Sequence, residues 1–423
     1  MTRPAGEPGL AGPDGRPLRV LQVAATAVGG TWFHDQVTGL AGRGHDVRAV
    51  VPGNGPLAEG LRAAGIPVEI IPFGLSRRVR QLPPLAAAEV RLFRLIRDFR
   101  PDVIHAHLLI GTLACRLASA GYRPALRVTQ VPGMPRLHIP VLRWLDRWTL
   151  RRDDVVIGSC QAIADQYQVL GARSVAVSYY GCDVHRLDPA TSGATFRSEF
   201  GLSSAAPTVG MVAHMYPSQL HRFGDTGIKG HEVFLAAAPL ILRKVPGAQL
   251  FIVGDELSGN GGYRSALEAM TADPGLAGRV HFTGHRTDIE RVLAGLDVVV
   301  NPSLEESACY TMIEALLMER GVVASNVGGL PDTVRHGKTG LLVPPADPAA
   351  LAAAITELLA DPSRRHEMGR RGRDHCLRQF DIEVTVAGLD ALYRKALSEL
   401  RRPRLSMSGS TRPGLARRTR PGT

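Results

Sequence analysis

The chain has 423 residues, of which 44% are hydrophobic and 5% aromatic, a composition that supports two or three folded domains and excludes wholesale disorder. Its formal net charge is +11, but residues 401–423 hold seven arginines and no acid, which leaves +4 on the remainder and disfavours a nucleic-acid binder. No apolar run approaches the roughly 20 residues that span a bilayer.

Residues 1–17 are rich in proline and glycine and contain no apolar segment. We expect a disordered leader there rather than a secretory signal. The five cysteines are widely spaced and form no C-x-x-C motif. This usage is typical of a reducing compartment, so we expect a cytoplasmic protein.

Short apolar runs then alternate with helix-like segments, a pattern typical of doubly wound parallel α/β sheets. Residues 18–182 are expected to form a first domain, with strands at 18–24, 47–51, 68–71, 103–105, 127–131, 155–157 and 175–179. Residues 183–207 lack periodicity and are rich in Pro, Ser, Thr and Gly, so they are interpreted as an interdomain linker.

A second alternating series fills residues 208–380, the expected second domain. Its strands are predicted at 208–214, 249–253, 280–283, 298–301, 322–326 and 340–343. A terminal helix is expected at 381–400 and a disordered basic tail at 401–423. Two such domains predict a ligand cleft at the carboxyl ends of their strands.

The strongest local signal lies where a predicted strand ends at Asn301 and a helix begins near Thr311. The loop and helix start can bring Glu306 and Glu314 to one pocket. Backbone amides beside a helix N-terminus suit a phosphate, and two carboxylates beside them suit the diols of a sugar nucleotide. The amides in question are those of Ser307, Ala308 and Cys309. Alternatively, Glu314 only forms a capping box with Thr311.

Other motifs follow in a fixed order: Gly29-Gly30, the segments 42–47 and 101–107, Lys229-Gly230, and the segments 282–284, 327–332 and 337–344. With the two acids, this ordered set resembles the retaining glycosyltransferases of family 4. The resemblance covers about residues 19 to 400. It implies the GT-B fold, in which two Rossmann-like parallel-sheet domains face each other across a cleft.

The resemblance also implies roles for individual residues. Glu306 resembles the acid that reaches the donor sugar, Glu314 the acid that binds the ribose, and Lys229 the cation on the donor diphosphate. The Gly29-Gly30 turn would approach phosphate or acceptor across the cleft, and Gly284 would belong to the donor side. Retention would proceed by same-face attack without a stable covalent intermediate.

No Asp-x-Asp motif is present to hold a metal, so we expect no metal and no cofactor, and the charge of the leaving diphosphate must be met by the protein. The family usually has an arginine where this chain has His214, a few residues before Lys229. His214 can still donate to phosphate. Arg222, in the long loop before Lys229, is the alternative, and a purely structural role for His214 stays open. After Glu314 a frequent Gly-x-Pro is replaced by residues 319–321, so that helix end is expected to differ without affecting the chemistry.

In the first domain, His105 and His107 end a predicted strand, and strand alternation is taken to mean that only one of them faces the cleft. His107 is assigned to catalysis. A metal ion bound by these two histidines would need a third ligand, and the sequence offers none nearby. Gln130 or His138 is expected to contact the acceptor, and the identity of an acceptor-side base is open.

Residues 139–152 combine Trp144 and Trp148 with four arginines. Such a helix either lies on an anionic membrane or packs its tryptophans into the first domain, and the second interpretation is simpler.

The sequence therefore predicts a metal-independent transfer of a hexose-type sugar from a nucleoside-diphosphate sugar to a hydroxyl acceptor, in polysaccharide or glycoconjugate biosynthesis. No nucleic-acid partner is expected, and peripheral contact at the inner membrane face is an option. Three alternatives stay open: glycosylation of a small secondary metabolite, a sugar-nucleotide epimerase of the same architecture, and a nicotinamide-dependent dehydrogenase.

Overall fold

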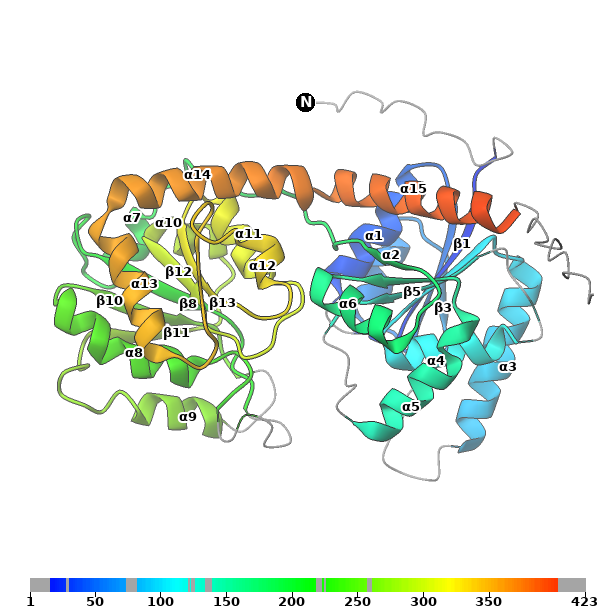
Figure 1. Cartoon of the computed structure of the whole chain (residues 1–423), viewed down its shortest axis with the longest axis horizontal. Coiled ribbons are helices and arrows are strands. Elements are labelled where there is room, and N and C mark those ends of the chain that lie inside the picture. The colour runs from blue at the N-terminus through cyan, green and yellow to red at the C-terminus, as the bar shows by residue number, and fades with distance from the viewer. Residues whose placement is uncertain are drawn as a thin grey trace, which may run out of the picture.

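A computed structural model describes residues 16–27, 30–73, 82–120, 122, 126–133, 139–217, 223, 226–256 and 261–401. Within these residues the chain forms two lobes, each built on one parallel sheet with helices on both faces (Figure 1). The GT-B expectation is thereby confirmed. The leader lies outside the described residues except for Arg16 and Pro17, and the tail lies outside except for Arg401.

The sheet of the first lobe has the order β3-β2-β1-β4-β5-β6-β7 within the described residues. Its strands are β1 (Arg19–Ala24), β2 (Asp46–Val51), β3 (Val68–Ile70), β4 (Val103–His107), β5 (Leu126–Val131), β6 (Val155–Gly158) and β7 (Val175–Val177). Between them run α1 (Thr31–Gly42), α2 (Pro56–Ala63), α3 (Leu82–Phe99), α4 (Leu109–Ala118), α5 (Pro140–Thr149), the 3-10 turn η2 (Leu150–Arg152) and α6 (Gln161–Leu170). The central strands are apolar runs because helices bury both of their faces.

The sheet of the second lobe has the order β11-β10-β8-β12-β13-β14 in the described part of the chain. Its strands are β8 (Thr208–Val212), β10 (Gln249–Val253), β11 (Val280–Gly284), β12 (Val298–Asn301), β13 (Gly321–Ser325) and β14 (Leu341–Val343). Its helices are α8 (His231–Lys244), α9 (Gly262–Ala269), α10 (Ile289–Gly295), α11 (Tyr310–Leu317), α12 (Leu330–Thr333), α13 (Pro348–Ala360) and α14 (Pro362–Gln379).

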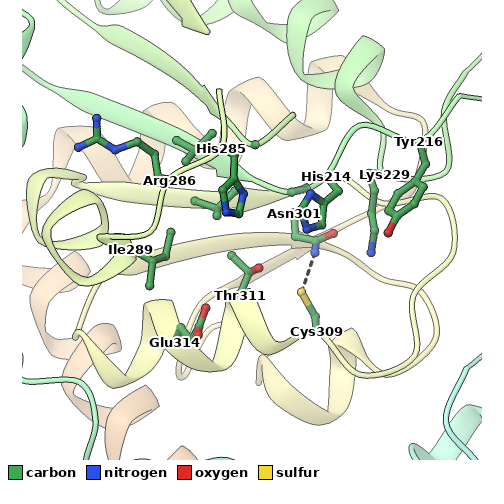
Figure 2. A pocket seen from close by; sticks show the side chains of 14 residues that line it. His214, Tyr216, Lys229, His285, Arg286, Ile289, Asn301, Cys309, Thr311 and Glu314 are labelled. Atoms are coloured by element: carbon green, nitrogen blue, oxygen red, sulfur yellow. Dashed lines mark hydrogen bonds between the residues drawn. The ribbon is translucent and has the colours of Figure 1, made fainter. Parts of the chain in front are cut away.

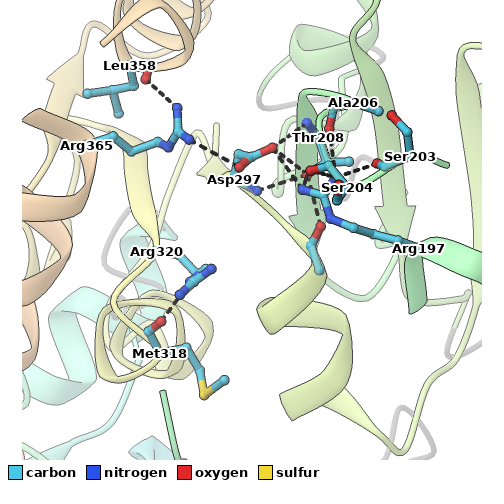
Figure 3. Close-up of polar contacts among 11 residues, drawn as sticks. Arg197, Ser203, Ser204, Ala206, Thr208, Asp297, Met318, Arg320, Leu358 and Arg365 are labelled. Carbon is cyan, nitrogen blue, oxygen red and sulfur yellow. Dashed lines mark hydrogen bonds and ion pairs between the residues drawn. The ribbon is translucent and has the colours of Figure 1, made fainter. Parts of the chain in front are cut away.

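The expected linker, residues 183–207, is attached to the second lobe. It contains α7 (Ala194–Glu199), and Phe196 is buried in the core beneath β12 and α11. Arg197 binds Asp297 at 3.1 Å, and the same carboxylate binds Arg365 of α14 at 3.2 Å and the Thr208 amide at 2.9 Å (Figure 3). Asp297 thus joins α7, β8 and α14.

The last helix, α15 (Ile382–Arg401), returns to the first lobe and lies along its outer edge (Figure 1). The two chain segments that cross between lobes pair with each other, because the Cys182 amide donates to the Phe380 carbonyl at 2.9 Å and the Ile382 amide to the Cys182 carbonyl at 3.0 Å. On α15, Tyr393 is fully buried against β1 and β4. Residues near the end of the chain therefore complete the core of the first lobe.

Candidate active site

A cavity of about 340 Å³ lies at the carboxyl ends of β8, β10, β11 and β12, where a parallel sheet is expected to hold its ligand. Figure 2 shows His214, His285 and Lys229 directed into it from the sheet side, with Thr311 and Glu314 opposite them on α11. The cavity therefore collects four of the predicted donor-site residues, namely His214, Lys229, Cys309 and Glu314.

Lys229 reaches this cavity from a tight turn before α8. Gly230 has a φ of +74°, and a Cβ there would overlap the carbonyl oxygen of Pro302. The Leu304 amide also donates to the Ile228 carbonyl at 2.9 Å. Only glycine permits this close approach, which fixes the Lys229 turn on the loop that carries Glu306.

Lys229 and Glu306 form an ion pair, with 2.6 Å between Nζ and Oε2. Their side chains are 24% and 8% exposed, so both charges are largely removed from water. Burial opposes the ammonium form of Lys229, but the Glu306 carboxylate outweighs that effect and raises the Lys229 pKa. The ammonium is therefore charged and held at the edge of the cavity.

The segment 327–332 packs closely against the backbone of the Glu306 loop. A Cβ at Gly328 would overlap the carbonyl oxygen of Glu306, and one at Gly329 would overlap that of Ser307. Gly328 also has a φ of +54°. The glycines in this motif thus set the position of the acid.

Of the three loop amides, that of Ser307 is engaged within the loop, because it donates to Oε1 of Glu306 at 3.1 Å. Ala308 follows it, and Cys309 caps the N-terminus of α11 and lines the cavity. Asn301 donates from Nδ2 to Cys309 Sγ at 2.9 Å, and burial raises the Cys309 pKa to about 12. Cys309 is therefore a neutral thiol.

Glu314 lines the cavity and pairs with Arg186, which comes from the segment between the sheets. Burial raises the Glu314 pKa, and Arg186 opposes that shift. The capping-box alternative is wrong, because α11 begins at Tyr310 and Thr311 already lies within its first turn. Glu314 is thus available to the cavity.

His214 lines the cavity beside His285, with ring centroids 6.1 Å apart and planes 7° apart. Its Nδ1 is buried and has no hydrogen-bond partner within the described residues. Arg222, the alternative phosphate ligand, lies outside them. Gly284 ends β11 with a φ of +72°, and its neighbours His285 and Arg286, rather than Gly284 itself, line the cavity.

The Glu306 loop also touches the first lobe. The Ser307 hydroxyl donates to the Pro132 carbonyl at 3.0 Å, and the Tyr310 hydroxyl donates to the Gly181 carbonyl at 3.4 Å. Asp332, from the supporting motif, accepts from the Gln161 amide at the start of α6 at 2.7 Å. The site therefore borders the region between the lobes.

The expectation for His105 and His107 is wrong. Residues i and i+2 of a strand share one face, and the two rings stack with centroids 4.2 Å apart. His107 is fully buried, with Nε2 2.8 Å from Gln22 Oε1 and Nδ1 2.9 Å from the Tyr180 hydroxyl. Burial, assisted by His105, lowers its pKa well below the usual value. The structure places His107 in the core of the first lobe, away from the cavity.

Gln130, one of the two predicted acceptor residues, does not line the cavity. Gln130 is buried and donates to the Ser178 carbonyl at 3.0 Å. His138 and Gly29 lie outside the described residues. Gly30 begins α1 in a left-handed conformation, with a φ of +108°.

Sequence reasoning missed Tyr216, His285 and Arg186. His285 directly follows the 282–284 motif at the end of a predicted strand, so its position was a usable signal. Arg186 had no such signal, because it contacts Glu314 across 128 residues of sequence.

Comparison with known families gives two matches. A family described as "Glycosyl transferases group 1" matches residues 218–361, and a "Glycosyl transferase 4-like domain" matches residues 29–182. The two matches correspond to the second and the first lobe.

Individual relatives agree with these matches. The D-inositol 3-phosphate glycosyltransferase of Segniliparus rotundus is 31% identical over 289 residues, which cover 63% of this chain and 62% of that protein, less than two thirds of its length. The 2-deoxystreptamine glucosyltransferase of Streptomyces kanamyceticus is 28% identical over 75% of this chain and 83% of that protein. The crystal structure of Anabaena HepE in complex with UDP has a TM-score of 0.75 at 22% identity, over 90% of this chain and all (100%) of that one, which shows a common fold.

Proposed function

Because the chain belongs to the group 1 glycosyltransferases of family 4 and has their GT-B fold, we propose that it transfers a hexose-type sugar from a nucleoside-diphosphate sugar to an acceptor hydroxyl. The transfer would retain the anomeric configuration and use no metal ion. One observation carries the proposal: Lys229 Nζ lies 2.6 Å from Glu306 Oε2 at the edge of a cavity that also holds Glu314.

Lys229 supplies the charge that departure of a nucleoside diphosphate requires. Negative charge accumulates on the leaving phosphate, and a fixed cation in a partly dry site stabilises it. In the unliganded protein Glu306 neutralises this cation. A bound diphosphate would replace Glu306 as the ion-pair partner of the Lys229 ammonium, and Glu306 could then bind the sugar.

Glu314, on the other side of the cavity, is also an acid that pairs with a basic side chain in the unliganded protein. Its carboxylate can accept two hydrogen bonds from the vicinal hydroxyls of a ribose. It is paired with Arg186, whose side chain is 56% exposed and can move aside without losing a buried position. Donor binding would therefore exchange two internal ion pairs for contacts with the ligand.

The acceptor carries a hydroxyl, and we propose a glycan or glycoconjugate assembled in the cytoplasm. A small cyclic acceptor is the second candidate, because the two relatives above are named for D-inositol 3-phosphate and 2-deoxystreptamine.

The decisive experiment offers the protein a set of nucleotide sugars with glycan and cyclitol acceptors and measures free nucleoside diphosphate. UDP-sugars come first, because HepE crystals contain UDP. NMR of the product gives the anomeric configuration, and an assay with EDTA tests metal independence. Isomerised donor without acceptor consumption would favour the epimerase, and an inverted product would contradict retention.

The site is tested with Lys229→Ala and Glu306→Gln. We expect each to lower kcat by about 100-fold or more, because each removes a charge that acts on the departing diphosphate or the sugar. Lys338→Ala, in an exposed turn, and Glu305→Gln are the matched controls, and unfolding curves check that every variant is folded. Near-normal turnover in both site variants would refute the assignment.

A further inference from the structure

Helix α5 presents an apolar stripe to solvent. Val141, Trp144 and Trp148 are 65%, 62% and 65% exposed. The two indole rings lie parallel, with centroids 6.0 Å apart and planes 5° apart. The simpler sequence interpretation, in which these tryptophans pack into the first lobe, is therefore wrong.

The opposite face of α5 is fixed to the first lobe by buried charges. Asp146 binds Arg116 of α4 at 2.7 Å and accepts from the Tyr167 hydroxyl at 2.6 Å. Asp146 and Arg116 have side chains only 1% and 2% exposed. Asp146 lies roughly half a turn from the tryptophans around the helix. Because this buried network orients α5, its apolar stripe must face outward.

Basic side chains accompany the stripe. Arg143, Arg147 and Arg151 are exposed on α5 and the turn after it, and the one acid of α5 is the buried Asp146. Single exposed apolar residues are ordinary on a protein surface. A stripe of tryptophans flanked by arginines is instead the arrangement that lies at the headgroup level of an anionic bilayer.

The position of α5 connects this surface to the active site. Figure 1 shows α5 at the edge of the first lobe opposite α15. The helix begins at Pro140, soon after Pro132, whose carbonyl accepts from Ser307 of the Glu306 loop. Only a short stretch of chain therefore separates the α5 surface from the residue that contacts the Glu306 loop.

We propose that α5 docks the protein on an anionic phospholipid bilayer, with Trp144 and Trp148 inserted at headgroup level and Arg143 and Arg147 on lipid phosphates. The docking does not depend on the sugar transfer. If both hold, an acceptor carried on a lipid would meet the cleft at the membrane surface.

The test is sedimentation of the full chain with phosphatidylcholine vesicles that contain or lack phosphatidylglycerol, at low and high salt. We expect binding only to the anionic vesicles, weakened by salt and accompanied by a blue shift of tryptophan emission. Six arginines follow residue 401 and could draw the chain to anionic lipid by charge alone, so variants of α5 are essential.

Trp144→Ala with Trp148→Ala should weaken vesicle binding by about tenfold or more and abolish the emission shift. Arg143→Gln with Arg147→Gln should weaken it by about fivefold for each charge removed. Arg370→Gln with Arg371→Gln removes the same charge from α14, where both arginines pair with Glu367, and should leave binding unchanged.

Absence of binding by the wild type, or equal binding by the double tryptophan variant, would overturn the proposal. So would loss of self-association in that variant without any effect of lipid, which would make α5 an interface between two copies. Transfer to a water-soluble acceptor should be unchanged in all α5 variants. A chain that binds vesicles but transfers no sugar would refute the proposed function alone.

Discussion

Glu319 occupies a backbone conformation that glycine adopts at lower cost. It follows the C-cap of α11 with a φ of +57°, the left-handed position at which helices usually end in glycine. The resemblance to family 4 also implies a glycine at this position. The departure noted in the sequence therefore has a structural cost, although it leaves the site intact.

We predict that Glu319→Gly stabilises the protein by about 0.5–1 kcal/mol, because relief of the left-handed strain exceeds the entropy that glycine adds to the unfolded chain. Denaturant unfolding at neutral pH measures the change. Glu357→Gly, inside α13, is the control and should cost about 1 kcal/mol. A loss of stability at both positions would show that residue 319 is not strained.

Individual site residues were predictable to different degrees. Lys229, Glu306 and Glu314 stand in local motifs at strand ends, so the sequence indicated their shared location. His107 also stands at a strand end, but the two-residue period of a strand turns it toward His105 and the core.

Among the elements, the segment around α7 differs most from its prediction. Its buried residues Val184, Leu187 and Phe196 have no helical or strand period, so nothing in the sequence distinguished it from a free linker. In the structure Asp297 holds it in place through Arg197, and the same carboxylate reaches Arg365 (Figure 3).

We predict that Asp297→Ala destabilises the second lobe by about 3 kcal/mol, because it leaves two partly buried arginines and the Thr208 amide without their acceptor. Calorimetry or urea unfolding measures the loss. Glu367→Ala is the matched control, since Glu367 also binds two arginines but lies exposed, and it should leave stability nearly unchanged. Equal effects would contradict the anchoring role of Asp297.

At the scale of the whole molecule, buried neutral histidines link stability to pH. Burial lowers the pKa of His105 to about 3 and that of His231, next to Lys229, to about 4, and His107 is lowered as well. The unfolded chain therefore binds more protons than the folded one below about pH 6.5. Burial raises the pKa of Glu89 to about 7 and also raises those of Glu314 and Asp153, and these three carboxyls act in the opposite direction. Burial lowers the pKa of His281 and His375 too, which adds to the histidine effect.

We predict that the free energy of unfolding falls on acidification from about pH 6.5 toward pH 4.5, each histidine contributing at most about 1.4 kcal/mol per pH unit. Urea unfolding across this range measures the slope. His231→Gln should reduce this slope by the contribution of one histidine. His366→Gln, on the exposed side of α14, should leave the slope unchanged. A stability that is flat across the range would contradict the neutral burial of these rings.

The overall architecture was the most predictable feature. Apolar runs marked nearly every strand, because strands of a parallel sheet are buried on both faces and read as continuous hydrophobic segments. The pairing of α15 with the first lobe was not predictable, since its contacts join residues such as Gln22 and Tyr393 that are 371 positions apart.

The packing of α15 on the first lobe has a consequence for biosynthesis. Val386, Leu389 and Tyr393 belong to the same core as β1 and β2. The ribosome must synthesise almost the entire polypeptide before the first lobe can complete its hydrophobic core. The strands of the second lobe and the helices between them are all synthesised before α15. Part of the core of the nascent first lobe therefore stays exposed until α15 emerges from the exit tunnel.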